Sequence, residues 1–176
     1  AAGEDIIVIG PKADGDREYD RGQKFRVIRT PWYEFGILRM APIFFLLPFI
    51  IVRYRVGRVI AMNIAYGGII SYLFSRLLGF KYILWAYGYE FAKFEDNRFI
   101  RSLYLRIYGR SVFVAAITEF VKARLDKFGV KPEKIVIVKP GTDPERYYPA
   151  PVKDAFIKRH GLEGKRVIMS VGRLIE

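Results

Sequence analysis

The sequence of 176 residues contains no cysteine and only one histidine, His160. Without cysteine the chain forms neither a disulfide framework nor a thiolate metal site, and this composition fits a reducing compartment. A single histidine argues against a histidine-based metal cluster and against a Ser-His-Asp triad. His160 precedes Gly161 and is interpreted as the C-terminal residue of a helix, so we expect no metal site.

Acidic residues are also missing from a long internal stretch. No Asp or Glu occurs between residues 35 and 89, where six basic residues do occur: Arg39, Arg53, Arg55, Arg58, Arg76 and Lys81. The net charge of the whole chain is +12. Such a surplus points to an anionic membrane surface, a nucleic acid or a phosphorylated substrate. The chain has no compact Lys/Arg run and no nucleic-acid-reading motif, so no nucleic acid is expected.

No apolar run is long enough to cross a bilayer. The candidate Met40–Val52 is shorter than the ~20 residues required and contains two prolines. Because arginines flank this run, we predict that it lies on an anionic membrane surface, where each basic residue adds ~1 kcal/mol. The contacting residues would be Arg39, Phe44, Phe45, Phe49, Arg53 and Arg55. The alternative is a buried core helix with basic ends.

Short apolar runs alternate with helical patterns along the chain. Strands are predicted at 6–9, 25–28, 59–62, 82–86, 112–117 and 135–138, and helices at 37–55, 66–78, 97–108, 119–128 and 154–160. The 66–78 helix is apolar on nearly every side and is expected to be buried. The stretch 12–23 is charged and is expected to be an irregular loop. The alternation predicts an α/β fold, with a Rossmann-like parallel sheet and helices on both faces.

The strand at 135–138 ends in a turn formed by Pro140, Gly141 and Asp143. A further apolar strand is predicted at 166–171. We therefore place a first domain at 1–150, a linker at 151–164 and the first strand of a second Rossmann-like domain at 165–176.

Four segments occur in the order found in a known family. They are Tyr87-Gly88-Tyr89-Glu90, Ala115 to Phe120 with Leu125, Lys134 to Pro149, and Val171-Gly172-Arg173-Leu174. They resemble, in turn, the His-Gly-x-Glu segment, a strand-to-helix junction, the hinge signature and the VGRL motif of GT-B glycosyltransferases of the retaining family 4. The resemblance covers residues 4–176 and identifies most of the chain as the N-terminal, acceptor-binding domain of that family.

The resemblance implies transfer of a sugar from a nucleotide-sugar to an acceptor hydroxyl with retention, without a metal or another cofactor. It gives Gly172 and Arg173 the role of binding the donor diphosphate, for which a fixed cation is suited. The alternative for Arg173 is a surface arginine. Acceptor-binding candidates follow two strands, where parallel sheets bind ligands: Asn63, Tyr87, Gly88 and Glu90. The alternative for Tyr87 is a tyrosine packed on the surface, and no catalytic residue is assigned.

Three features depart from the family pattern. Tyr87 stands where the family usually has a histidine, and Ile60 and Met62 also replace histidines. The family's first strand, loop and helix have no counterpart before Ile6, so we expect a preceding segment, without which the sheet would contain a hole. Gly67 and Gly68 could present N–H groups to a phosphate, and close helix packing explains them equally well.

The sequence thus predicts the acceptor-side half of a glycosyltransferase, inactive alone. Its acceptor would be lipid-linked or a carbohydrate, and it would be cytoplasmic and peripheral at the inner membrane face. One alternative is a non-catalytic basic module that binds anionic membrane or nucleic acid. Another is a sugar-nucleotide epimerase of related architecture.

Overall fold

The computed structural model describes residues 6–31, 40–92, 94, 96–145, 147–151 and 154–169. It divides into a larger unit, 1–140, and a smaller unit, 141–176. Strands are described only in the larger unit, whereas the smaller one has helix α7 (Asp154–Arg159).

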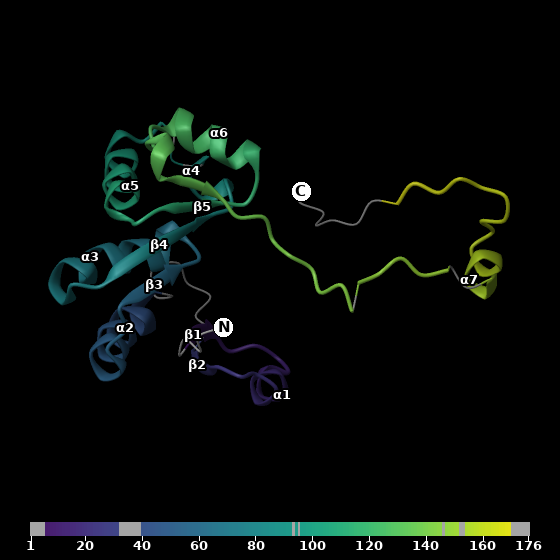
Figure 1. Ribbon diagram of the computed structural model, residues 1–176, viewed down its shortest axis with the longest axis horizontal. Coiled ribbons are helices and arrows are strands. Elements are labelled where there is room, and N and C mark those ends of the chain that lie inside the picture. Colours follow the sequence, from purple (N-terminus) through teal and green to yellow (C-terminus); the bar gives the residue numbers. More distant parts are fainter. Residues whose placement is uncertain are drawn as a thin grey trace. The chain divides into compact units, whose positions relative to one another are not determined.

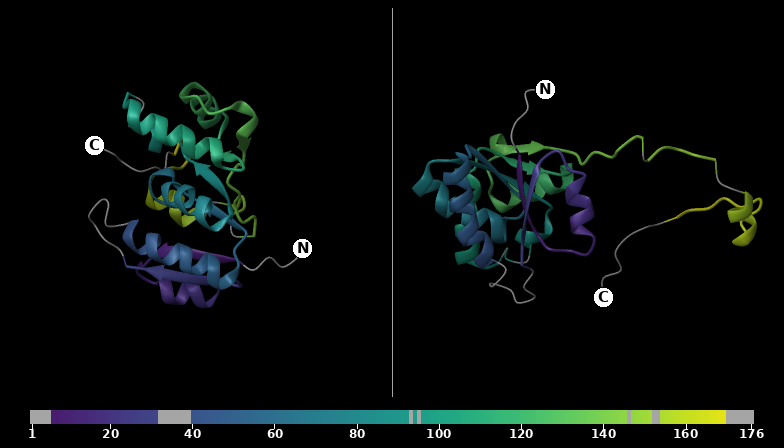
Figure 2. Two further views of the ribbon diagram at one scale, coloured as in Figure 1. Left: turned by 90° about the vertical axis from the view of Figure 1, so that its left-hand side faces the viewer. Right: turned by 90° about the horizontal axis from the view of Figure 1, so that it is seen from below.

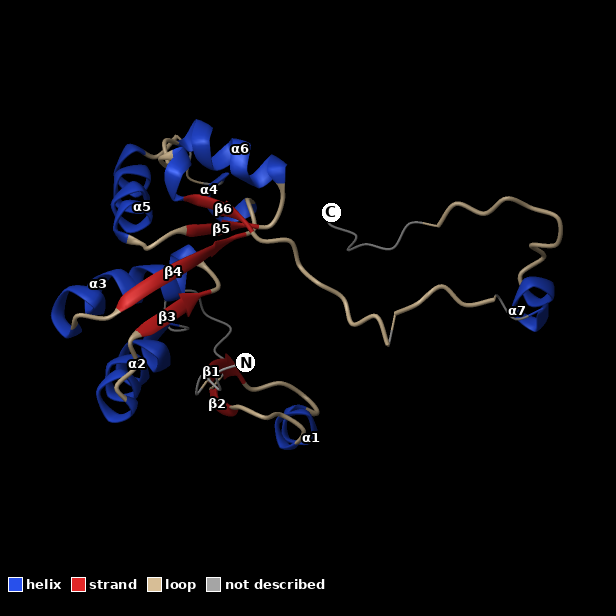
Figure 3. Ribbon diagram, viewed as in Figure 1, coloured by secondary structure: helices blue, strands red, loops and turns tan. Residues whose placement is uncertain are grey.

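The strands of the larger unit form two parallel sheets (Figures 1 and 3). The first consists of β1 (Ile7–Pro11) and β2 (Arg26–Thr30). The second has the order β3-β4-β5-β6, with β3 (Arg58–Ala61), β4 (Lys81–Ala86), β5 (Val114–Ala116) and β6 (Ile135–Ile137). The predicted α/β fold with parallel strands is confirmed. The expected single sheet is instead two sheets, because no strand among the described residues pairs with both β1 and β3.

Helices lie on both sides of the strands. Figure 1 shows α2 (Met40–Tyr54), α3 (Ile69–Leu78) and α5 (Arg98–Arg110) on one side and α1 (Asp16–Arg21) on the other, as does the right-hand view in Figure 2. The remaining helical elements are η2 (Ile64–Gly68), α4 (Tyr89–Ala92), α6 (Glu119–Phe128) and η3 (Pro132–Lys134). The α1 helix lies where an irregular loop was expected. None of its residues is buried, so it lacks the apolar periodicity by which helices are predicted.

The hydrophobic core lies on one face of the four-stranded sheet. Along β4 the side chains of Tyr82, Leu84 and Ala86 are buried and belong to one cluster with α5 and α6 residues. The Tyr82 hydroxyl donates a buried hydrogen bond of 2.6 Å to the carbonyl of Ile107 in α5. Of the residues of the other parity, Ile60 in β3 and Val136 in β6 are exposed and those of β4 are half-buried or exposed, whereas Ala115 in the central β5 is buried. This alternation is the period of two that a strand imposes on its side chains.

Two further expectations differ from the structure. The 66–78 helix was expected to be buried, but it begins as the π-helix η2 and α3 leaves Leu73 and Leu77 exposed. The α3 helix packs against α2, α5 and β4, which cover only part of its circumference. The strand expected at 166–171 is not formed in its described part, which ends at Met169. A parallel strand needs a neighbour, and the described residues of the smaller unit contain none.

Candidate functional site

The carboxyl ends of β3, β4 and β5 bring three loops together. These strands are neighbours in the sheet, so the segments that follow them lie along one edge. Asn63 follows β3, Tyr87 follows β4, and Thr118 comes two residues after β5. The edge beyond the carboxyl ends of parallel strands is where open α/β sheets bind ligands, so these loops form the candidate site.

Glu90 holds the turn after β4. Its carboxylate oxygens accept hydrogen bonds from the backbone N–H groups of Tyr87 and Gly88, both at 2.9 Å. The side chain is 6% exposed. Hydrogen bonds to a carboxylate are among the stronger ones in proteins, so this residue fixes the backbone on which Tyr87 stands.

Both the backbone conformation at position 88 and a neighbouring side chain favour a glycine there. Its φ is +103°, a value that favours glycine, and an added Cβ would lie 3.0 Å from Cγ2 of Val121 in α6. The Gly88 carbonyl accepts a long, 3.5 Å hydrogen bond from Arg124, also in α6. The turn after β4 is therefore packed directly onto α6.

Tyr87 presents a hydroxyl at this edge. Its side chain is 37% exposed, and its ring centroid lies 6.3 Å from that of Tyr89. Burial raises the pKa of Tyr87, and the neighbouring Tyr89 and Glu90 raise it further. The hydroxyl is therefore protonated at neutral pH, where it can donate a hydrogen bond and cannot act as a base.

Asn63 caps η2 with its side chain. Its Oδ1 accepts a hydrogen bond of 2.7 Å from the N–H of Ala65. A Cβ on Gly68 would lie 2.9 Å from Cδ2 of Leu84, so close packing of η2 on the sheet explains that glycine. Of the two readings of the glycine pair, the structure therefore supports packing.

The third loop contains aromatic and basic groups that the sequence analysis did not select. Thr118 caps α6 by accepting a hydrogen bond of 3.2 Å from the N–H of Val121. Phe120 is 69% exposed, and the guanidinium of Arg124 lies 5.9 Å from its ring centroid. The sequence could have indicated this pair, because residues four apart share a helix face and α6 begins at the sheet edge.

Several of the predicted site residues lie outside the described part of the structure. They are Gly172 and Arg173 of the donor-binding prediction and Arg39 of the membrane prediction. Within the described part, no group of His, Asp and Glu side chains is placed to hold a metal ion.

The remaining membrane-contact candidates are partly gathered on α2. Phe45, Phe49 and Val52 are 73%, 63% and 66% exposed, and their spacing of four and three residues places them on one stripe. The opposite stripe, with Leu47, Ile50 and Ile51, is buried. The α2 helix therefore packs on the core with one apolar face and exposes another.

The exposed stripe continues onto α3. The rings of Phe44 in α2 and Phe74 in α3 are 5.1 Å apart. We call the exposed apolar residues of both helices the α2–α3 surface: Phe44, Phe45, Phe49, Val52, Leu73 and Leu77. Basic residues in and after these helices are exposed: Arg53, Arg55, Arg58, Arg76 and Lys81. In the described part of the chain none of them has a carboxylate partner, and none of the helices there is long and apolar enough to span a membrane.

Comparison with known proteins identifies the family whose pattern the chain matches. Residues 1–146 match the model of the family described as Glycosyltransferase Family 4. A glycosyltransferase from Rickettsia africae is similar over 90% of this chain and 41% of its own, with a TM-score of 0.63 and 20% identity. Anabaena HepE in complex with UDP-glucose is similar over 90% of this chain and 42% of its own, with a TM-score of 0.62 and 13% identity. The chain thus spans about two fifths of these structures, and no curated protein sequence matches it.

Proposed function

The chain belongs to glycosyltransferase family 4, and from this premise we propose that it is the acceptor-side part of an enzyme that moves a sugar from a nucleotide-sugar to an acceptor hydroxyl with retention. The observation that carries the proposal is the hydrogen-bonded turn from Tyr87 to Glu90 at the carboxyl edge of the sheet. The complex of Anabaena HepE with UDP-glucose supports a uridine-diphosphate sugar as the first donor to test. Family membership favours this reaction over that of a sugar-nucleotide epimerase.

In this proposal the residues of the strand-end loops have separate roles. The Tyr87 hydroxyl donates a hydrogen bond to an acceptor oxygen, because it is protonated and partly exposed. Glu90 and Gly88 position the turn rather than the sugar, since their contacts are with the backbone of the turn and with α6. Asn63 holds the neighbouring loop by capping η2 with its side chain. The diphosphate of the donor is assigned to Gly172 and Arg173.

The reaction is tested with radiolabelled UDP-glucose and extracted membrane lipid as acceptor. We expect no transfer by the 176-residue chain alone and transfer when it is joined to a family donor-binding domain that contributes the rest of the donor pocket. In that joined enzyme, Tyr87→Phe should raise the KM for the acceptor, whereas Tyr148→Phe, an exposed tyrosine in the smaller unit, should not. Transfer by the chain alone would overturn the proposal that it is an inactive half.

We further propose that the acceptor is lipid-linked and is met at an anionic membrane, with the enzyme peripheral on the inner face. The support is the α2–α3 surface, whose exposed apolar side chains lie near arginines that have no carboxylate partner among the described residues. Such a surface buries its aromatic residues at the level of the headgroups and attracts anionic lipids.

Flotation with phosphatidylserine-containing and purely phosphatidylcholine vesicles tests this surface. The chain should float with the anionic vesicles, and the double variant Phe45→Ser/Phe49→Ser should not. Phe99→Ser is the matched control, because Phe99 is 79% exposed but lies on α5. Equal absence of binding to both vesicle types would contradict membrane contact.

A second candidate is a non-catalytic module that binds anionic membrane, and the α2–α3 surface and the +12 charge favour it equally. Nucleotide-sugar binding separates the two candidates. If the joined enzyme binds vesicles but neither binds nor turns over any nucleotide-sugar, the module is the better description.

A further inference from the structure

Three aromatic side chains are exposed where the candidate site meets α6. Tyr87 follows β4, Tyr89 begins α4 and Phe120 lies in the first turn of α6. Their exposed fractions are 37%, 67% and 69%. Exposed apolar side chains that gather in one place mark ligand or partner sites, whereas scattered ones do not. We call these three residues the aromatic patch.

Two contacts bring the members of the aromatic patch together. Gly88 lies against α6, since an added Cβ there would be 3.0 Å from Cγ2 of Val121. Tyr89 follows Gly88 and Phe120 precedes Val121, so each is one residue from this contact. Arg124 donates a 3.5 Å hydrogen bond to the Gly88 carbonyl, and its guanidinium lies 5.9 Å from the ring centroid of Phe120. The ring of Phe120 therefore lies on the side of α6 that faces the turn.

Polar groups border the aromatic patch. The Tyr87 hydroxyl can donate and accept hydrogen bonds, and the exposed carboxylate of Glu119, the first residue of α6, can accept them. Glu90 does not serve a ligand in this way, because its oxygens already accept the N–H groups of the turn. A negatively charged ligand would be repelled by Glu119, so the patch favours a neutral one.

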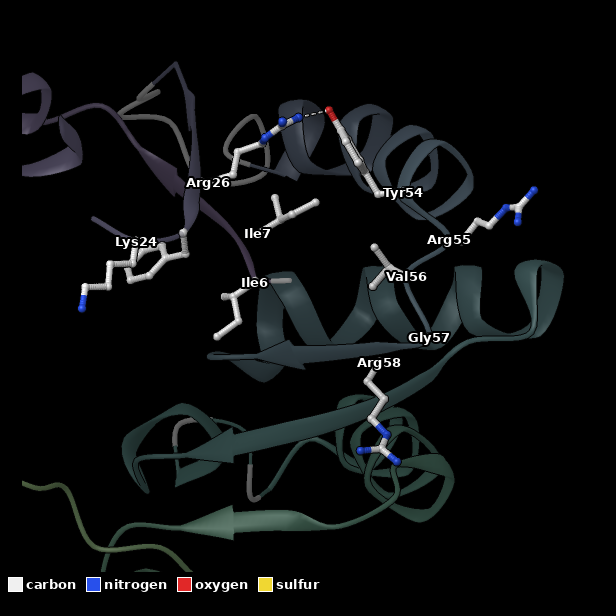
Figure 4. A pocket seen from close by; sticks show the side chains of 10 residues that line it. Ile6, Ile7, Lys24, Arg26, Tyr54, Arg55, Val56, Gly57 and Arg58 are labelled. Carbon is white, nitrogen blue, oxygen red and sulfur yellow. Dashed lines mark hydrogen bonds between the residues drawn. The ribbon is translucent and has the colours of Figure 1, made fainter. Parts of the chain in front are cut away.

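A cavity of about 720 Å³ in the larger unit is not an alternative place for this ligand. It lies at the amino ends of two strands, since its lining includes Arg26, which begins β2, and Arg58, which begins β3. β4 starts level with β3, and Tyr87 follows the other end of β4, about 20 Å away at about 3.3 Å per residue. The charged ends of Lys24, Arg55 and Arg58 point away from one another (Figure 4), so they do not converge on one anion either.

We propose that the aromatic patch binds a neutral sugar ring of the acceptor, so that the enzyme extends an existing glycan rather than glycosylating a bare lipid. A sugar ring is amphipathic in the way that the patch requires. Its C–H groups form an apolar face that packs on an aromatic ring, and its hydroxyl groups exchange hydrogen bonds with Tyr87 and Glu119. A lipid alcohol has no ring to stack. This inference rests on the proposed function, and it implies that an earlier glycosyl transfer supplies the acceptor.

The test titrates the full 176-residue chain with the neutral methyl glycosides of glucose, galactose and mannose. NMR should show saturable shifts of the Gly88 and Val121 amides with at least one glycoside. Glycerol, which has hydroxyl groups but no ring, should cause none. Glucose 1-phosphate should bind several-fold more weakly than methyl glucoside, because it adds negative charge beside Glu119.

Variants that keep an apolar side chain but remove its flat face make the test sharper. Phe120→Leu and Tyr89→Leu should each raise the Kd of the glycoside about five- to tenfold. Both side chains are exposed, so the variants are expected to fold. Phe99→Leu is the matched control, since Phe99 is 79% exposed but lies on α5, and its Kd should equal that of the unaltered chain.

Three results would overturn the inference: no shift with any glycoside, equal shifts with glycerol, or an unchanged Kd in both leucine variants. Its failure differs from a failure of the proposed function. If the joined enzyme transferred glucose to a lipid without sugar, and Phe120→Leu did so equally well, the transferase would stand and the sugar-binding patch would not. If glycosides bound but the joined enzyme transferred nothing, the patch would stand as a sugar site and the transferase would not.

Discussion

The turn after β4 shows how two residues fix the position of a third. Glu90 satisfies the N–H groups of Tyr87 and Gly88, and Gly88 adopts a φ of +103° against Val121. In the proposed function the Tyr87 hydroxyl is the group that would meet the acceptor, and the other two residues would determine where it stands. A binding residue of this kind depends on neighbours that never touch the ligand.

Gly88→Ala is expected to lower the free energy of unfolding by about 2 kcal/mol, since it adds both backbone strain and a close contact with Val121. Chemical denaturation measures the change. Gly109→Ala is the control, because this position lies inside α5 in open surroundings, and alanine there should raise the free energy of unfolding by about 0.5 kcal/mol. Equal effects of the two substitutions would show that the turn is not held as described.

The sequence identified this turn but not its internal bonding. Tyr87, Gly88 and Glu90 were selected because they follow a strand and match a family segment. That Glu90 binds backbone N–H groups depends on its rotamer and on the path of the chain, which residue types alone do not determine. Phe120 and Arg124 were not selected as site residues, because in the sequence their positions on α6 are those of an ordinary solvated helix face.

At the scale of elements, the C-terminal end of α2 has a strained backbone position that is occupied by a charged surface residue. The N–H of Val56 donates to the carbonyl of Ile51 at 3.1 Å, a hydrogen bond typical of a Schellman helix end. The residue between the helix and Val56 is Arg55, with a φ of +51°, where glycine is usual. The chain thus accepts strain at a position that carries an exposed arginine beside the α2–α3 surface.

Arg55→Gly is expected to raise the free energy of unfolding by about 0.5–1 kcal/mol, because glycine adopts this conformation without strain. The matched control is Arg53→Gly, which removes the same charge from inside α2 and should lower that free energy by about 1 kcal/mol. Thermal denaturation measures the stability and vesicle flotation measures the binding. Both variants should bind anionic vesicles less well, by similar amounts. If only Arg53→Gly, the less stable variant, lost binding, the electrostatic explanation would be contradicted.

Elements were predicted best where one physical signal dominates. The six strands of the larger unit were predicted because each is a short apolar run bounded by turn residues. The helix from Glu119 to Phe128 was predicted because Thr118 and Gly129 mark its ends. The burial of α3 was predicted wrongly because a helix that is apolar all round carries no information on which side faces the core. The division into two sheets depends on which strands are neighbours, and a sequence pattern does not contain that information.

For the larger unit as a whole, buried tyrosines predict how stability changes in alkaline solution. Burial raises the pKa of Tyr82 and of Tyr108, so the folded chain holds these protons more tightly than the unfolded chain. The stability contributed by these groups is therefore fully present below the unfolded pKa of about 10 and is lost as the pH rises above it. Denaturation measured between about pH 8 and 11 should show this fall, and Tyr82→Phe should reduce its slope. A slope unchanged in that variant would contradict the assignment to Tyr82.

In the proposed membrane binding, the net charge of +12 and the α2–α3 surface would make separate contributions, and salt distinguishes them. Attraction between the arginines and anionic lipid is screened over about 10 Å in 0.1 M salt and about 3 Å in 1 M, whereas burial of apolar side chains is not weakened in this way. Binding to anionic vesicles should therefore fall as NaCl rises from about 0.1 to 1 M without disappearing.

The part of the binding that survives high salt should depend on the exposed stripe of α2. Phe45→Ser/Phe49→Ser should remove it, while Arg53→Gly should weaken binding in low salt and leave the high-salt part almost unchanged. Co-sedimentation at both salt concentrations measures the two parts. If binding did not change with salt, the arginines would not contribute. If the phenylalanine variant matched the unaltered chain at high salt, the aromatic stripe would not contribute to the part of the binding that survives screening.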